Sequence, residues 1–139
     1  NGNATFNITN PVAGGTTQLS VGAVTGNANT ITVTGNGNLV QTGAIASSAA
    51  PALTLGAGYA GLTTLSQANT YSGITQVNGG TLAFSTSGNL GDASATNTIG
   101  LGGGRLRYTG TGALDLTANR VVTLSPGTTS TIDVPSTTA

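Results

Sequence analysis

Leucine or isoleucine recurs along the chain at a nearly constant interval, and this interval restricts the possible folds more than any other feature. Six positions, separated by 20, 23, 20, 24 and 26 residues, form the series Leu19, Leu39, Leu62, Leu82, Leu106 and Ile132. A repeat of this length built on strands is typical of stacked β architectures, in which each coil buries its apolar side against the next. We therefore expect these six side chains to form one stacked core column.

Two of the repeats align closely over seven positions. Gly79–Ser85 reads GGTLAFS and Gly103–Thr109 reads GGRLRYT, so the same residue classes recur except at two positions that become arginine. If the coils stack, Leu82 and Leu106 take the same place in neighbouring coils. Contact between these two leucines is therefore the most direct test of the architecture.

Composition favours strands over helices. Threonine, the most frequent residue, is β-branched and suits a pleated, half-buried surface, while 23 glycines supply tight corners. Glutamate, lysine and methionine, which are strong helix formers, are absent. The alanine-rich stretch 44–52 is interrupted by serines and Pro51, so we expect a loop or a bulging corner there.

Ionisable residues are rare and balanced. Three arginines and three aspartates give a net charge of zero, and no residue before Asp92 is charged. A chain without a basic cluster is a poor candidate for binding nucleic acid or anionic membranes. No apolar run approaches the ~20 residues that a membrane-spanning helix requires, so no membrane-spanning segment is expected.

Strand-like runs bounded by Gly, Asn or Pro cover most of the chain. Alternation of apolar and polar residues places one side chain inward and the next outward. The inward set is expected to include Ile31, Val33, Leu82, Phe84, Leu106, Tyr108, Leu114, Leu116, Val122, Leu124, Ile132 and Val134. The expected strands are Thr5–Thr9, Thr17–Val24, Thr30–Thr34, Leu39–Thr42, Ala52–Leu55, Leu62–Ser66, Ile74–Val77, Thr81–Ser85, Thr98–Leu101, Arg105–Thr109, Ala113–Thr117, Val121–Ser125 and Thr131–Val134.

Two all-β folds fit these strands. The repeat length favours a parallel β-helix, or β-solenoid, with coils of about 20–26 residues. The Gly-Gly and Asn-Gly pairs between runs also suit hairpins, so a Greek-key β-sandwich is the alternative. Parallel pairing between residues one coil apart supports the solenoid, whereas antiparallel neighbours support the sandwich.

The segment Leu65–Leu82 reads LSQANTYSGITQVNGGTL. It resembles the autotransporter-associated β-strand repeat, a motif of secreted bacterial passenger domains. The repeat-motif residues are Leu65, Asn69, Thr70, Tyr71, Ser72, Gly73, Thr75, Asn78, Gly79, Gly80, Thr81 and Leu82. Gln67, Ile74 and Gln76 depart from the family pattern, and the resemblance extends more loosely over Gly35 to Val134.

The resemblance implies a right-handed parallel β-helix that is exported and displayed outside the cell. It also implies that the motif is structural, because no catalytic residue belongs to it. Residues 1–139 would then form a single β-solenoid segment, which belongs to a longer chain or to a head-to-tail polymer.

Patterns that carry chemistry are weak in this chain. Gly56–Gly61 has the spacing GxGxxG, but a strand-like run follows it where a dinucleotide site needs a helix. Asp92, Asp115 and Asp133 are the only carboxylates available for acid–base catalysis, and no histidine, lysine or cysteine accompanies them. We therefore expect no enzyme activity, no cofactor and no metal.

Arg105 and Arg107 lie two apart on one expected strand, and hence on one face. They suit either a small anion or glycan, or a structural pairing with Asp115 or Asp133 one coil away. Pairing is the favoured interpretation. Asn3 and Asn7 match glycosylation sequons, but such matches arise easily in a chain rich in Asn and Thr.

Two functions follow as hypotheses. The first is an extracellular structural solenoid at the bacterial surface, which forms a stalk, spacer or filament wall and whose partners are copies of itself or further coils of the same chain. The second is an adhesin that binds surface glycans, for which exposed aromatic residues would be needed. Five aromatic residues are present, and most fall at inward positions.

Overall fold

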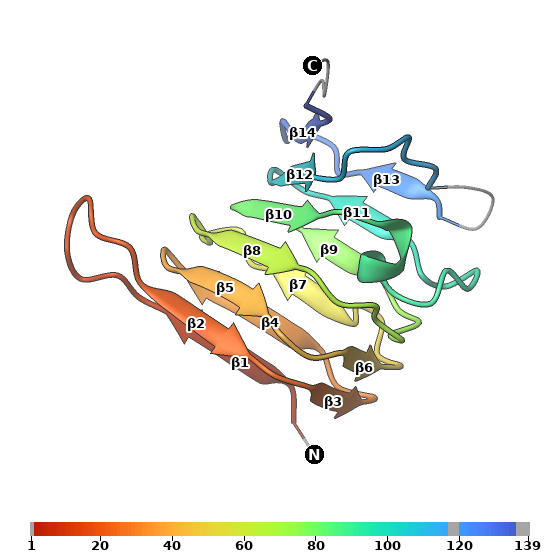
Figure 1. Cartoon of the computed structure of the whole chain (residues 1–139), viewed down its shortest axis with the longest axis horizontal. Helices are drawn as coiled ribbons and strands as arrows, with labels where there is room; N and C mark the ends of the chain where they lie inside the picture. Colours follow the sequence, from red (N-terminus) through yellow and green to blue (C-terminus); the bar gives the residue numbers. More distant parts are fainter. Residues whose placement is uncertain (1, 117–119, 136–139) are drawn as a thin grey trace.

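The computed structural model describes residues 2–116 and 120–135, and within them the chain winds into a parallel β-solenoid. Strands stack turn upon turn along one axis, with β1 (Ala4–Ile8) and β2 (Gln18–Val21) at one end (Figure 1). β13 (Val122–Leu124) and β14 (Thr131–Asp133) lie at the opposite end. The expected all-β solenoid is thus confirmed.

Three parallel sheets form the walls in the described part of the chain. Sheet A has six strands: β1, β4 (Ile31–Gly35), β7 (Leu53–Leu55), β9 (Thr75–Val77), β11 (Ile99–Leu101) and β13. Sheet B also has six: β2, β5 (Asn38–Gln41), β8 (Leu62–Leu65), β10 (Thr81–Phe84), β12 (Arg105–Tyr108) and β14. Sheet C pairs β3 (Val24–Asn27) with β6 (Ile45–Ser47).

Register decides between the two folds that the sequence allows. Every strand pair within residues 2–116 and 120–135 is parallel, and partners lie 19 to 27 residues apart. Parallel neighbours need a crossover connection, which hairpins and Greek keys do not supply. Leu82 lies beside Leu106 in this register, as expected. The Greek-key alternative is therefore wrong.

The predicted leucine column is correct in register except at one position, and its two end members, Leu19 and Ile132, are exposed and do not belong to the buried core. Leu19, Leu39, Leu82, Leu106 and Ile132 occupy one column of sheet B, but the place between Leu39 and Leu82 belongs to Thr63. Leu62 instead pairs with Thr81 on the outer side and is half-buried. A shift of one residue moves a side chain to the other face of a strand, so the leucine interval alone misplaced Leu62.

Two columns of sheet A complete the core. Inward side chains are apolar at most levels because alternating strands must bury one side. One column contains Ala4, Ile31, Leu53, Thr75, Ile99 and Val122, and the other Phe6, Val33, Leu55, Val77, Leu101 and Leu124. Side chains of the middle turns are fully buried, whereas those of the terminal turns are not.

The structure corrects three local predictions. The expected strand Thr17–Val24 is interrupted at Gly22 and Ala23, so that Gln18–Val21 belongs to sheet B and Val24 begins β3 of sheet C. Ile45–Ser47, inside the expected loop 44–52, is strand β6, because it pairs with β3 of the turn before. Residues 113–116 form no strand, and Leu114 and Leu116 are only partly buried; Thr117 lies outside the described residues. A 3₁₀ helix, η1 (Ser87–Leu90), forms a corner that the sequence did not predict.

Candidate functional site

The repeat motif builds the third wall of the solenoid. Its segment 69–73 continues sheet C by hydrogen bonding without being a regular strand. The backbone nitrogen of Thr70 donates to the carbonyl of Ile45 at 3.0 Å, and that of Ser72 donates to the carbonyl of Ser47, also at 3.0 Å. The motif therefore serves as the bridge between β6 and the turns that follow.

Asn69 is a buried corner residue whose side chain links three turns. Its Oδ1 accepts hydrogen bonds from the side chain of Gln41 and from the backbone nitrogen of Ile45, the latter at 2.7 Å. Its Nδ2 donates to the carbonyl oxygen of Asn89 at 2.5 Å. Asn89 in turn accepts from Thr86 N at 2.9 Å and so shapes η1. Each buried amide is thus paired, which burial of polar groups requires.

Tyr71 points into the core and is fully buried. Its hydroxyl lies 2.8 Å from the hydroxyl of Thr75, which occupies an otherwise aliphatic column of sheet A. Burial raises the pKa of Tyr71 to about 12, although the hydrogen bond with Thr75 acts in the opposite direction. A phenol that is neutral and enclosed in this way serves packing, since no solvent or substrate reaches it.

Most of the remaining motif residues lie at the corner between β9 and β10, and Leu65 lies earlier, in β8. Leu65 is buried in β8, Leu82 is buried in β10, and Thr81 begins that strand. Asn78, Gly79 and Gly80 form the corner between β9 and β10. Gly80 adopts a φ of +60°, and a Cβ added at Gly79 would overlap carbonyl oxygens of the turn before. Glycine is required there by close approach of two turns.

Arg105 and Arg107 point outward from β12, where they meet Asp133 of the next turn. Nη1 of Arg105 lies 3.5 Å and Nε of Arg107 3.6 Å from Oδ2 of Asp133. Exposed pairs of this kind contribute about 0.2–1 kcal/mol. The structural pairing expected from the sequence is therefore present for Asp133.

Arg120 is a buried arginine that sequence reasoning did not single out. Its side chain donates to the carbonyl of Ser87 at 2.6 Å and to that of Gly91 at 3.0 Å, across the 3₁₀ corner. Burial lowers the pKa of Arg120, while Tyr71 and Asp92 act in the opposite direction. No local pattern distinguishes this arginine, because its carbonyl partners lie about thirty residues away.

The other chemical candidates are dispersed. Asp92 accepts from the backbone and the hydroxyl of Ser94, at 2.9 and 2.7 Å, and Asp115 is an exposed residue between the partly buried Leu114 and Leu116. Among the described residues, no group of three or more His, Cys, Asp or Glu side chains is placed to hold a metal. Gly56–Gly61 is a corner that leads directly into strand β8.

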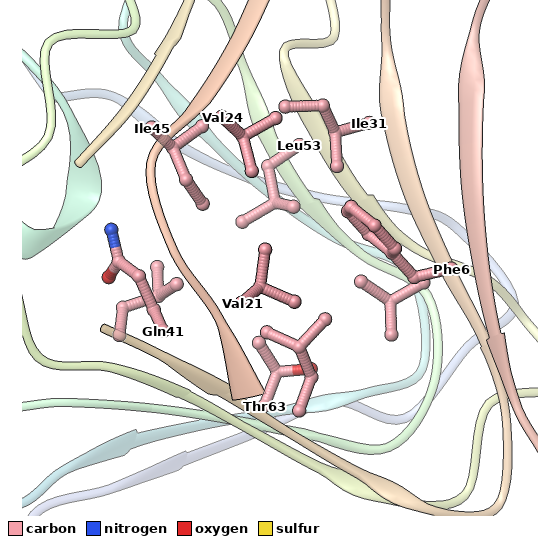
Figure 2. A pocket seen from close by; sticks show the side chains of 11 residues that line it. Phe6, Val21, Val24, Ile31, Gln41, Ile45, Leu53 and Thr63 are labelled. Carbon is pink, nitrogen blue, oxygen red and sulfur yellow. The ribbon is translucent and has the colours of Figure 1, made fainter. Parts of the chain in front are cut away.

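A small cavity lies inside the first turns, and Figure 2 shows Phe6, Val21 and Val24 pointing into it. Its volume is about 10 Å³, and its polar lining consists of Gln41 and Thr63. That is about the smallest space that holds a water molecule. The cavity is therefore a packing feature and not a ligand site.

A shallow depression of about 240 Å³ crosses the outer side of sheet C. It is uncharged, and it is lined by Thr25, Asn27, Ala46, Ser47, Ser48, Thr70 and Ser72. No aromatic ring borders it. Tyr59, Tyr71, Phe84 and Tyr108 are buried in the core, and Phe6 packs against it.

The strongest candidates for interaction are the two ends of the solenoid. Leu124 is 66% exposed, whereas Leu101, beside it in the same column, is completely buried. Ile132 is 54% exposed, and its neighbour Leu106 is 1% exposed. At the other end Leu19 is 38% exposed, against 3% for Leu39. The core columns thus extend to the first and last turns that the structure describes, and these side chains are exposed there.

No protein-family model, curated protein or solved structure matches the chain. Across residues 2–116 and 120–135, no helix is long and apolar enough to cross a membrane.

Proposed function

We propose that the chain is a structural β-solenoid segment of a secreted bacterial surface protein, where it acts as a stalk or spacer without catalytic activity. The observation that carries this proposal is the continuity of the core columns through the turns that the structure describes. Each turn of a solenoid contacts only its neighbours, so the length of the structure is set by the number of turns.

Export and surface display are proposed from the resemblance of Leu65–Leu82 to the autotransporter-associated repeat. Asn69, Tyr71 and Gly73 each have a structural role at the corner of a turn, which fits the motif as a determinant of solenoid folding. The side walls supply a second argument: their uncharged hydroxyl and amide groups offer little acid–base chemistry. We therefore attribute the function of this segment to its shape and not to a chemical reaction.

An in-register deletion tests the spacer role. Leu53, Thr75 and Ile99 are register partners, so removal of residues 53–98 takes out two complete turns and joins Ala52 to Ile99. Adjacent strands are about 4.8 Å apart, so the surface-displayed protein should become shorter by about 10 Å. The deletion of residues 53–99 is the matched control, because it places the outward Gly100 at an inward position and should prevent folding.

The measurement is energy transfer between dyes on cysteines introduced at either flank, on intact bacteria that display the protein. Because residues 1–139 contain no cysteine, no native side chain of this segment reacts with the dyes. A spacer keeps its display and loses about 10 Å in the in-register form. Dyes that react only after cell lysis would contradict surface display, and an unchanged distance would contradict the spacer role.

Glycan adhesion is the second candidate, and the depression over sheet C is the observation that favours it. Its hydroxyl and amide lining offers hydrogen bonds to a neutral sugar, although stacking on an aromatic ring is not available in that lining. The double variant Thr70→Val and Ser72→Ala removes two hydroxyls from the lining. Adhesion predicts retention on a glycan array that this variant weakens, and a spacer predicts no retention by either protein.

A further inference from the structure

We propose that the solenoid continues from one molecule into the next, with β13 and β14 of one copy docking on β1 and β2 of a second copy. This inference rests on the proposed structural role and deepens it by naming the partner. The partner is identical in sequence, and the contact is head to tail.

Strand order makes the two ends geometrically compatible. Sheet A begins with β1 and ends with β13, and sheet B begins with β2 and ends with β14. Pairing is parallel throughout the described part of both sheets. A copy shifted along the solenoid axis therefore presents two parallel edges to two parallel edges at once, as strand addition requires.

The columns match in register as well as in direction. Leu124 belongs to the sheet A column that begins with Phe6, and Ile132 belongs to the sheet B column that begins with Leu19. Stacking a second copy in the same register places its Phe6 beside Leu124 and its Leu19 beside Ile132. Apolar groups thus meet apolar groups.

Polar positions match too. In the outer column of sheet A, Thr123 would meet Thr5 of the second copy, and in sheet B Asp133 would meet Ser20. Cross-strand threonine pairs are favourable on a sheet surface. No position in this register opposes an apolar side chain to a charge.

The two N-terminal edge strands, β1 and β2, lack the side chains that prevent strand addition. Natural edge strands are blunted by lysine, proline or inward-pointing charges. β1 and β2 contain none of these, and the sequence before Asp92 has no charge at all. The single carboxylate on β14, Asp133, is paired with Arg105 and Arg107 of its own chain. Approach of the two ends meets no like-charge repulsion.

The symmetry of this contact determines the product. A head-to-tail contact uses different surfaces on the two molecules, and when it does not close into a ring it generates a filament. Because the contact is head to tail, each added copy again presents the same end to the next copy. We expect a filament whose width is that of a single solenoid.

Two end-blocked variants test the proposal. Leu124→Lys with Ile132→Lys blocks the C-terminal end, and Ala4→Lys with Leu19→Lys blocks the N-terminal end. All four side chains are exposed in the single molecule, so the fold should persist, which circular dichroism checks. Thr32→Lys with Thr64→Lys adds the same charge at one outward position of each sheet, on different sheets as in the end-blocked variants, and serves as the matched flank control.

Sedimentation and electron microscopy of the 139-residue chain provide the readout. The unmodified chain and the flank control should form filaments that grow with concentration, and each end-blocked variant alone should stay monomeric. Mixing the two end-blocked variants should give a dimer and nothing larger, since one intact head meets one intact tail. A monomeric unmodified chain, filaments lost in the flank control, or a mixture without dimers would overturn the proposal.

These outcomes separate the inference from the proposed function. If the chain stays monomeric but the in-register deletion still shortens the displayed protein, self-assembly is contradicted and the spacer role stands. If the chain forms filaments but the deletion leaves the distance between the dyes unchanged, self-assembly stands and the spacer role is contradicted.

Discussion

Nδ2 of Asn69 donates a hydrogen bond of 2.5 Å to the carbonyl oxygen of Asn89, although twenty residues separate them along the chain. With the bond from Gln41 to Asn69 Oδ1, this contact connects three successive turns through one buried corner. Buried amides are expensive to leave unpaired, so such a ladder favours one alignment of the turns over its neighbours.

Asn69→Ala should therefore be strongly destabilising. It leaves the Gln41 side chain and the backbone nitrogen of Ile45 without a buried acceptor, at about 1–3 kcal/mol for each group. Urea unfolding followed by circular dichroism measures the change. Asn36→Ala, at an exposed corner, is the control and should have a much smaller effect. Equal losses for both variants would contradict a structural role of the buried ladder.

Leu82→Ala and Leu62→Ala form a matched pair for the corrected column. Leu82 is fully buried in the core, and Leu62 is on the outer side of the neighbouring strand. Loss of a buried leucine costs about 2–5 kcal/mol, because a cavity remains. We expect Leu62→Ala to cost less than half as much in the same urea titration. A larger loss at Leu62 would mean that the register of β8 is shifted by one residue.

Gly73→Ala should disrupt the third wall. A Cβ at this position would overlap the carbonyl oxygen of Ala49 in the preceding turn. Backbone cannot move aside as a flexible side chain does, so the two turns must separate. Gly58→Ala is the matched control, because no heavy atom lies within 4 Å of its added Cβ. Thermal unfolding should show a large decrease in Tm for Gly73→Ala and little change for Gly58→Ala.

The free energy of unfolding should decrease at high pH, because the phenol of Tyr71 is buried in its neutral form. Its pKa is raised by burial from 10.0 to about 12. Between these values the unfolded chain has released the phenolic proton while the folded chain retains it. The stabilisation that this pKa difference gives the folded state is thus fully present below pH 10 and is lost as the pH rises towards 12. Urea titrations at a series of pH values in this range measure the slope.

Tyr71→Phe should flatten this slope, and the double variant Tyr71→Phe with Thr75→Val is the control in which no hydroxyl is left unpaired. Tyr59, whose pKa burial also raises, contributes a residual slope in every form. If the wild type and Tyr71→Phe showed parallel pH dependence, the buried state of Tyr71 would be wrong.

Much of the fold could be predicted because residues at the same place in consecutive repeats become register partners in neighbouring strands. The alignment of Gly79–Ser85 with Gly103–Thr109 placed Leu82 beside Leu106, and the structure has them paired. Local pattern was insufficient at Leu62, because Leu62-Thr63-Thr64-Leu65 does not say which side faces inward. The structure resolves this with the hydroxyl of Tyr59, which accepts a hydrogen bond from buried Thr63 at 3.1 Å.

What the sequence determined by itself was the kind of architecture: short threonine-rich strands at a regular interval, glycine at the corners, and almost no charge. Only the tertiary structure decided that Ile45–Ser47 is a strand, that Arg120 caps the carbonyls of a distant corner, and that Asn69 joins three turns. The physical reason is the same in each case. These residues find their hydrogen-bond partners in neighbouring turns, and such partners are defined by the stacking of turns and not by adjacent sequence.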